Sequence, residues 1–230
     1  MREVVLDTET TGLSAELGDR IVEIGCVELF DRRATGRVFH TYLNPGRKMS
    51  AEAFQITGLS DEFLSDKRRF ADIASEFVAF VGDAPLVIHN AAFDIKFLNS
   101  ELARISLADL RFDRVIDTLD LARRRFPGSP LNLDALCRRF SINNSGREKH
   151  GALLDSELLA EVYLELTGGR QGALSFAVKE IALSPGLEAH ITEFRRKTPL
   201  PQRVSLAEVE AHIAFVQKLG EKALWNTFLR

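Results

Sequence analysis

The sequence predicts an α/β fold in which helices cover a mixed sheet, followed by a smaller C-terminal element. Three strand-like segments come first, and helical and strand-like segments then alternate up to residue 168. A length of 230 residues with 45% hydrophobic content allows one full-sized core with residues left over. Gly168 and Gly169 end this body, because paired glycines cannot usefully continue a helix.

The strands are predicted from apolar runs and period-two alternation. Residues 2–8 form a short buried strand, and residues 20–30 and 37–44 form two more, joined by a turn over 31–36. Apolar residues at helical spacing, such as Phe70, Ile73 and Phe77, predict a helix over 70–81. The later segments are strands at 85–89 and 115–117 and helices at 91–105, 118–126, 131–140 and 153–166.

The C-terminal part differs in kind from the body. Residues 1–168 hold 21 Lys and Arg against 27 Asp and Glu, whereas residues 169–230 hold 9 against 6. Three prolines and a basic run predict a flexible linker over 169–204. Residues 205–230 regain apolar positions but are too few to form a core, which predicts a helical segment that folds against a partner. The alternative is a helix folded back on its own domain.

Composition excludes several classes of protein. A net charge of −3 argues against a protein that coats nucleic acid through bulk electrostatics. An acidic body can still act on DNA if its carboxylates hold divalent cations, which reverse the charge that a phosphate meets. Cys26 and Cys137 form no CxxC or Cys/His cluster, so neither a disulfide framework nor a zinc site is expected. With no signal peptide and no long apolar run, we expect a cytoplasmic protein without membrane contacts.

Two acids at the end of the first strand are the first candidate site residues. Asp7 and Glu9 stand two apart in VVLDTET, so a strand places both carboxylates on one face, an arrangement suited to a metal ion. Taken alone, the pair could equally be two solvated strand acids. Gly12 follows closely and leaves room for a ligand to approach the backbone.

Three more candidates begin helices later in the chain. Asp94 in IHNAAFDIKFL follows a strand, and an acid there could be only a residue favoured by the helix dipole. Its neighbour Phe93 could contact a nucleotide base, but packing in the core is favoured. In HGALLDSELL, His150 precedes a helix and Asp155 lies in its first turns. A lone histidine there is usually a surface or capping residue, but beside several carboxylates it becomes a candidate general base.

These residues carry a family resemblance. The segments DTETTG, HNAAFDIKFL and HGALLDSELLAEVYL resemble the three motifs of the DEDDh exonuclease superfamily, and most closely those of the proofreading (epsilon) subunits of bacterial DNA polymerase III. SAEAFQITGLSDEFL and LDALCRRF add similar context, so the resemblance covers residues 3–168. It implies a ribonuclease H-like fold with a five-stranded mixed sheet, a DEDDh domain over 1–168, and proofreading 3′-to-5′ exonuclease activity.

The resemblance also implies chemistry. Asp7, Glu9, Asp94 and Asp155 would hold two Mg²⁺ or Mn²⁺ ions, and His150 would act as general base in hydrolysing the terminal phosphodiester. The products would be deoxynucleoside monophosphates, released from a single-stranded or mispaired 3′ end. Asp7, Glu9 and Asp155 would also contact the substrate.

Two further positions match substrate contacts of the family. Glu52 and Thr57 match residues that hold the terminal nucleotide near its 3′-hydroxyl. Several relatives have histidine where this chain has Thr57, before Gly58, which makes Glu52 the firmer match. Glu52 could also be only a first-turn acid of a helix capped by Ser50.

The tail resembles partner-binding segments. Gln171, Leu174 and Phe176 match anchors of the short motif by which bacterial replication proteins bind the sliding clamp. The segment around Trp225 resembles the part of epsilon subunits that binds the polymerase (alpha) subunit. Whether a further small accessory subunit binds the body is left open.

Two other readings compete with a polymerase subunit. Another enzyme of the superfamily, such as an exoribonuclease or a free-standing repair exonuclease, would share the catalytic residues but would not need the clamp motif and partner segment. A non-catalytic scaffold would be expected to have lost at least one of the four acids or the histidine, and all five are present.

Overall fold

The computed structural model describes residues 1–146, 149–169 and 204–219. The chain divides into two units that are described separately. The first contains every element from β1 to α7, and the second contains α8. Across these residues, no helix combines the length and the apolarity needed to cross a bilayer.

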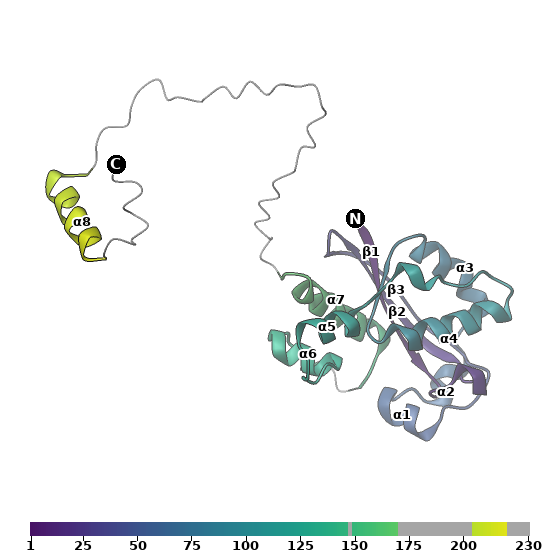
Figure 1. Cartoon of the computed structure of the whole chain (residues 1–230). Coiled ribbons are helices and arrows are strands. Elements are labelled where there is room, and N and C mark those ends of the chain that lie inside the picture. Colours follow the sequence, from purple (N-terminus) through teal and green to yellow (C-terminus); the bar gives the residue numbers. More distant parts are fainter. Residues whose placement is uncertain (147–148, 170–203, 220–230) are drawn as a thin grey trace, which may run out of the picture. The chain divides into compact units, whose positions relative to one another are not determined.

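The first unit contains a five-stranded mixed sheet in the order β3-β2-β1-β4-β5. Strand β1 pairs antiparallel with β2, and β2 with β3, whereas β1, β4 and β5 run parallel. Figure 1 shows α3 and α4 on one side of the sheet and α5, α6 and α7 on the other. The predicted mixed sheet flanked by helices is therefore confirmed. The strands are Arg2–Thr10 (β1), Ile21–Phe30 (β2), Arg33–Tyr42 (β3), Leu86–Ile88 (β4) and Val115–Asp117 (β5).

Six α-helices besides α7 complete the described part of the first unit. Two of them, Ala51–Thr57 (α1) and Asp61–Ser65 (α2), are short and are capped by Ser50 and Ser60. The others are Phe70–Val81 (α3), Ala91–Arg104 (α4), Thr118–Arg125 (α5) and Leu133–Phe140 (α6), and Ala152–Leu166 (α7) follows. Single 3₁₀ turns lie at Ala15–Leu17 and Phe112–Arg114.

The turn between β2 and β3 is shorter than the sequence predicts. Phe30 faces Arg33 across the ladder, so only Asp31 and Arg32 form the turn, with φ angles of 49° and 63°. Two successive residues with positive φ match the twist of a tight hairpin. The prediction of a turn over 31–36 was wrong in extent because this turn has no Asn-Gly or Asp-Gly signal.

Alternation along β1 assigns its side chains to two cores. Val4 and Leu6 pack in the cluster that contains Phe77 of α3 and Leu98 of α4. Val5 packs on the other face, with Leu159 and Tyr163 of α7. Continuing this alternation places Asp7 and Glu9 on the face that α7 covers.

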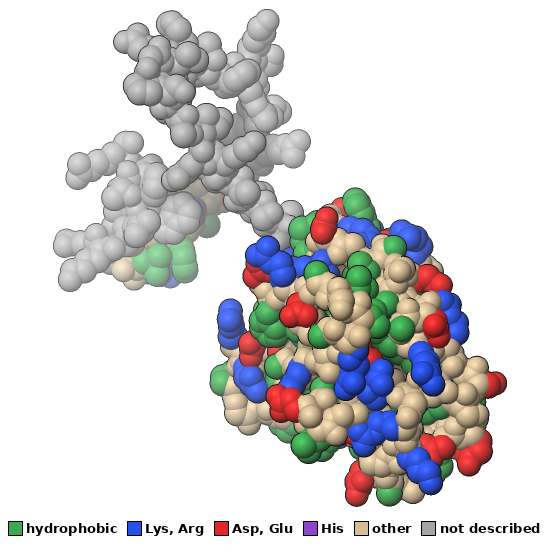
Figure 2. Space-filling view, turned by 90° about the vertical axis from the view of Figure 1, so that its right-hand side faces the viewer, with side chains coloured by type: hydrophobic (Ala, Val, Ile, Leu, Met, Phe, Trp, Pro, Cys, Tyr) green, Lys and Arg blue, Asp and Glu red, His purple; other side chains and the backbone are tan. Residues whose placement is uncertain are grey.

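The surface of the first unit mixes charges of both signs. On the face drawn in Figure 2, Lys and Arg side chains are interspersed with Asp and Glu. This mixture gives no broad basic field for nucleic acid on that face.

The described part of the second unit is helix α8, Leu206–Lys218. It begins with a capping box in which Ser205 accepts a bond from the Glu208 N–H and the Glu208 carboxylate accepts one from the Ser205 N–H. Leu206 and Phe215 are 79% and 59% exposed. The predicted helical segment is thus confirmed from residue 206 to residue 218.

Candidate active site

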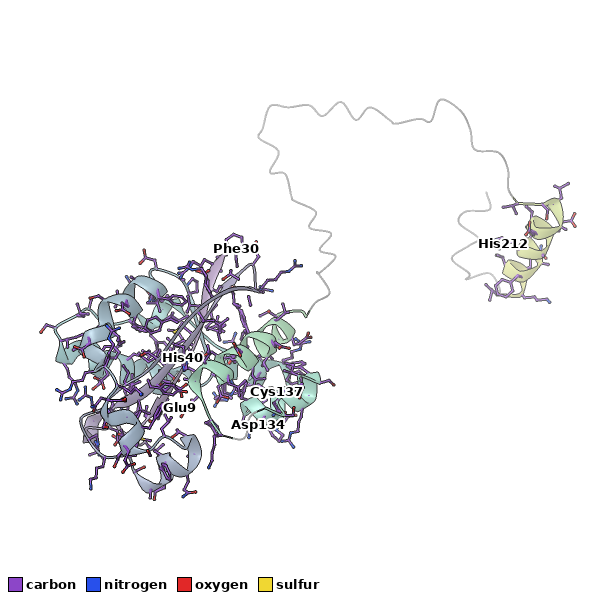
Figure 3. The ribbon with its side chains drawn as sticks, turned by 180° about the vertical axis from the view of Figure 1, so that it is seen from behind. Glu9, Phe30, His40, Asp134, Cys137 and His212 are labelled. Atoms are coloured by element: carbon purple, nitrogen blue, oxygen red, sulfur yellow. The ribbon has the colours of Figure 1, made fainter. Side chains whose placement is uncertain are left out.

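The first carboxylates lie at the end of β1. In the antiparallel ladder Asp7 is opposite Gly25 and Glu9 is opposite Glu23. Figure 3 shows Glu9 at the end of the sheet, on the same side of the molecule as Asp134 of α6. Asp7 lines a cavity of about 310 Å³ together with His89, Asn132, His150 and Asp155.

Helix α7 is held over this point by Gly25. A Cβ atom on Gly25 would lie 2.2 Å from the Ala152 carbonyl carbon, so no larger residue fits without moving the helix. The Ser156 hydroxyl donates a 2.9 Å bond to the Gly25 carbonyl oxygen. Because Gly25 is the ladder partner of Asp7, this contact brings Asp155, in the first turn of α7, to the Asp7 carboxylate.

Asp94 reaches the site from the first turn of α4. Its Oδ1 accepts bonds from the Thr8 amide, at 3.0 Å, and from the Thr8 hydroxyl, at 2.7 Å. Residue Asp117 of β5 fixes the start of α4, because its carboxylate accepts hydrogen bonds from the backbone amides of Asn90 and Ala91. Asn90 has a left-handed backbone with φ of 63°, which turns the chain sharply from β4 into α4.

His150 lies just before α7 and meets two of the acids. Its Nδ1 is 3.3 Å from Oδ2 of Asp155, and ligand atoms of Glu9, His150 and Asp155 lie within 4.8 Å of one another. The His150 amide donates to the Ile56 carbonyl oxygen, which ties this segment to α1. The imidazole is 47% exposed, so water and substrate can reach it, whereas Asp155 is 5% exposed.

The electrostatics of the cluster are unfavourable without cations. Burial and the neighbouring charges of Asp94, Glu9 and Asp155 raise the pKa of Asp7 well above its ordinary range. The residue as a whole is partly buried and lines the cavity. Burial raises the pKa of Asp94 to about 7 despite the bonds from Thr8. Strongly perturbed carboxylates gathered in a cavity are typical of functional sites.

The donor set fits hard divalent cations. Carboxylate oxygens are the ligands that such ions prefer, and the mutual repulsion of Asp7, Glu9, Asp94 and Asp155 is the charge that cations would neutralise. The structure thus brings together the five catalytic candidates that the sequence predicts.

The two predicted substrate contacts lie on α1. Glu52 is exposed in its first turn, whereas Thr57 is 6% exposed and its hydroxyl donates to the Ala53 carbonyl oxygen. The predicted clamp anchors Gln171, Leu174 and Phe176, and the predicted polymerase contact Trp225, lie outside the described residues.

Several residues that build the site were not predicted. Gly25 seats α7, Thr8 and Asp117 fix Asp94, and Glu23 adds a further buried carboxylate that raises the pKa of Asp7. An acid in the apolar strand IVEIG was a signal for Glu23. The other roles depend on strand register and helix docking, which single segments do not reveal.

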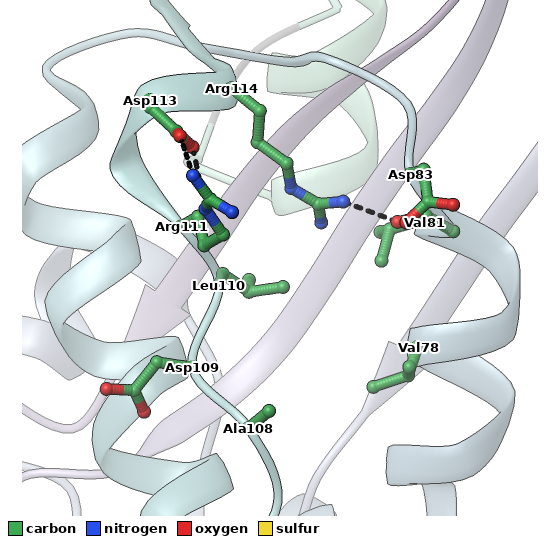
Figure 4. A pocket seen from close by; sticks show the side chains of 10 residues that line it. Val78, Val81, Asp83, Ala108, Asp109, Leu110, Arg111, Asp113 and Arg114 are labelled. Atoms are coloured by element: carbon green, nitrogen blue, oxygen red, sulfur yellow. Dashed lines mark hydrogen bonds and ion pairs between the residues drawn. The ribbon is translucent and has the colours of Figure 1, made fainter.

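A second hollow lies at the opposite end of β4 and β5. It has a volume of about 580 Å³ and contains Asp83, Asp109 and Asp113. Figure 4 shows Arg111 paired with Asp113, and Arg114 donating to the Gly82 carbonyl oxygen near Val81. Its three aspartates share the hollow with two arginines, Arg111 and Arg114, whereas no lysine or arginine lines the cavity of the carboxylate cluster.

Comparisons with known proteins agree with this geometry. A family model described as an exonuclease matches residues 4–163. DNA polymerase III subunit epsilon of Rickettsia conorii is 47% identical over 97% of this chain and 98% of its own length. The epsilon subunit of Escherichia coli is 45% identical over 98% and 97% of the two chains.

Solved structures give the same fold. Exonuclease X in complex with 5′ overhanging duplex DNA is 26% identical, with a TM-score of 0.57 over 71% of this chain and 90% of its own. The nuclease domain of 3′hExo, a DEDDh family member bound to rAMP, gives a TM-score of 0.62 at 19% identity, over 72% and 91%. The DEDDh superfamily uses divalent metal ions. This chain belongs to the exonuclease family that includes the epsilon subunits of DNA polymerase III.

Proposed function

We propose that this chain is the proofreading 3′-to-5′ exonuclease of a bacterial replicative DNA polymerase. One observation carries the proposal: four carboxylates and a histidine meet at one end of an exonuclease fold, in a chain that aligns over nearly its whole length with epsilon subunits. Enzyme class follows from the family, and the role of each residue is inferred from its position.

Asp7, Glu9, Asp94 and Asp155 would hold two divalent cations, Mg²⁺ or Mn²⁺. When bound, the ions would supply charge stabilisation for the attacking oxygen of water and for the departing 3′ oxygen of the phosphodiester. The four side chains contribute fixed positions: Asp7 and Glu9 from one strand face, Asp94 through its bonds to Thr8, and Asp155 through the seating of α7 on Gly25.

His150 would accept the proton of the attacking water. Asp155 lies 3.3 Å from Nδ1 and can stabilise the imidazolium that forms, as an orienting carboxylate does in other general-base pairs. The water oxygen bonds to phosphorus, the bond from phosphorus to the 3′ oxygen breaks, and the departing oxygen gains a proton. A deoxynucleoside monophosphate leaves, and the strand is one nucleotide shorter.

Glu52 and Thr57 would hold the terminal nucleotide near its 3′-hydroxyl. Exposure of Glu52 on α1 and the bond from the His150 amide to Ile56 support this placement, because α1 is fastened to the segment that carries the base. The bonds of Thr57 within α1 leave it the weaker contact.

The partners of the chain would be DNA and other replication proteins. Residues 171–176 would bind the sliding clamp, and residues 205–230 the polymerase (alpha) subunit. Exposure of Leu206, Ile213 and Phe215 on α8 supports a helix that buries apolar side chains against a partner. Such a chain would act in the cytoplasm, at the replication fork.

The test is degradation of a 5′-labelled primer with a mispaired 3′ end. Purified protein with Mg²⁺ or Mn²⁺ should shorten the primer one nucleotide at a time and release monophosphates. EDTA and the Asp7→Asn variant should both stop the reaction. A folded wild-type protein that shortens neither this primer nor an RNA strand would overturn the catalytic proposal.

A further inference from the structure

A groove leads away from the carboxylates towards α5. Its volume is about 470 Å³, and it shares two lining residues, His89 and Asn132, with the cavity that contains Asp7 and Asp155, so the two hollows lie side by side. The groove is lined by His89, Asn90, Leu119, Arg123, Ser129, Leu131 and Asn132.

The charge of this groove differs from that of its neighbours. Its lining includes one arginine, two asparagines and a serine, but no acidic residue. The adjoining active-site cavity, in contrast, is lined by three aspartates, Asp7, Asp134 and Asp155. The chain as a whole is acidic, and its active site contains several carboxylates. The groove beside the site has no acidic lining residue, so it is a local surface that suits a phosphate.

Arg123 carries the positive charge of the groove. Burial lowers the pKa of His89, the Asp117 carboxylate and the Leu131 backbone oppose this shift, and the Arg123 charge adds to it. The charge of Arg123 therefore acts at the inner end, where groove and cavity meet. Arg123 pairs with Asp120 at 2.9 Å, but the two side chains are 61% and 55% exposed. An exposed pair of this kind contributes little to stability, so a phosphate can replace Asp120 at low cost.

The neighbouring arginines of α5 have other environments. Arg125 donates to the carbonyl oxygens of Glu165 and Leu166 and stacks on Phe126, so it fastens the end of α7. Arg124 is exposed on the same turn as Arg123 and lines neither hollow. Arg124 has the same charge as Arg123 and lies on the same turn of α5, so it serves as the control for Arg123.

We propose that this groove binds the nucleotides that precede the scissile phosphodiester, with Arg123 contacting a backbone phosphate and the amides of Asn90 and Asn132 contacting sugar or phosphate oxygens. Glu52 and Thr57, the proposed contacts of the terminal nucleotide, lie on α1 and do not line the groove, so the groove can take a different part of the strand. Phosphate contacts position a strand without reading its sequence, as a proofreading enzyme requires. The proposal rests on the proposed exonuclease function.

The test compares Arg123→Gln with Arg124→Gln on substrates of different length. The p-nitrophenyl ester of thymidine 5′-monophosphate and a thymidine dinucleotide have no phosphate before the scissile one, whereas an oligothymidylate of about eight nucleotides does. Arg123→Gln should raise KM for the oligothymidylate about ten-fold, the effect of one lost charge-assisted contact, and leave both short substrates unchanged. Arg124→Gln should behave as wild type on all three.

Two further measurements separate a phosphate contact from a structural effect. The slope of log KM against log salt concentration for the oligothymidylate should fall by about 0.7 in Arg123→Gln but not in Arg124→Gln. Arg123→Lys should recover most of the affinity, and Asp120→Asn, which releases Arg123, should lower KM.

The outcomes distinguish this proposal from the function on which it rests. Wild-type activity with equal KM values for Arg123→Gln and Arg124→Gln would overturn the groove alone. Equal impairment of Arg123→Gln on the short ester and on the oligothymidylate would also overturn it, because the residue would then act on the site itself. Wild-type protein that hydrolyses none of the substrates would overturn the exonuclease function and the groove together.

Discussion

Helix α4 carries two buried carboxylates, seven residues apart, in opposite environments. Glu101 is 3% exposed, and its carboxylate accepts hydrogen bonds from Nε and Nη2 of Arg20, at 2.5 and 2.6 Å. Asp94 is also 3% exposed, and burial raises its pKa to about 7, with a smaller contribution from the nearby Asp117 carboxylate. One acid is neutralised by an arginine of the protein, whereas the other is one of the proposed cation ligands. Proteins tolerate such unbalanced sites where function requires them.

The largest effect is expected from substitutions in the carboxylate cluster of the active site. Asp155→Asn should reduce kcat by about a thousand-fold or more, because metal ions contribute several kcal/mol to the transition state and each 1.4 kcal/mol is ten-fold. Single-turnover cleavage of a labelled primer measures this. The fold should remain intact, since an isosteric amide replaces one of several repelling charges. Retention of a tenth of the wild-type rate would show that Asp155 holds no essential ion.

His150→Gln should have the next largest effect. Loss of a general base typically reduces kcat by about a hundred- to ten-thousand-fold, while the four carboxylates remain. The variant should therefore bind Mn²⁺ much as the wild type does, as measured by electron paramagnetic resonance of the free ion. A large loss of Mn²⁺ affinity would instead place His150 among the ligands.

Breaking the ion pair between Glu101 of α4 and Arg20 should lower the stability of the fold. Glu101→Gln leaves Arg20 without its charge partner, and breaking a buried pair lowers the free energy of unfolding by about 3 kcal/mol. The loss should be somewhat smaller here, because the Arg20 side chain is 26% exposed and water can solvate its charge. Urea unfolding measures the loss. Exonuclease activity below the melting range should stay within about two-fold of wild type. A large fall in kcat at unchanged stability would contradict the division between the two acids.

The smallest effect is expected at Thr57. Its hydroxyl donates to the Ala53 carbonyl oxygen and accepts from the Leu59 amide, so Thr57→Val should cost about 1 kcal/mol of stability. As a substrate contact it should also raise KM, with Thr57→Ser restoring it. An unchanged KM in Thr57→Val would assign this residue to the end of α1 alone and leave Glu52 as the contact with the terminal nucleotide.

The same contrast explains what the sequence could predict. Asp7 and Glu9 were predictable because a period of two fixes their common face, and Asp155 because it opens a long helix after His150. That these side chains lie close together was not predictable. Their proximity depends on the strand register that places Gly25 opposite Asp7, and on the close approach of Ala152 in α7 to Gly25. The extent of the turn after Phe30 was missed, since Asp31 and Arg32 give no sequence signal for positive φ.

The carboxylate cluster should lower the stability of the fold when no cation is bound and raise it when cations bind. The pKa of Asp94 is raised to about 7, so the folded protein keeps a proton that the unfolded chain loses above about pH 4. Stability contributed by this protonated acid is therefore lost as pH rises between these two values. Asp94→Asn preserves the acceptor for Thr8 and removes the titration.

The most direct measurement is thermal unfolding of wild type and Asp94→Asn at pH 5 and pH 8, with and without Mn²⁺. Without metal, the variant should melt above wild type at pH 8 and close to it at pH 5. Saturating Mn²⁺ at pH 8 should reverse the order, because wild type gains stability by binding, by about 2.7 kcal/mol at a hundred times Kd, and the variant gains less. A metal-free variant that melts below wild type at pH 8, or equal gains with Mn²⁺, would contradict the claim.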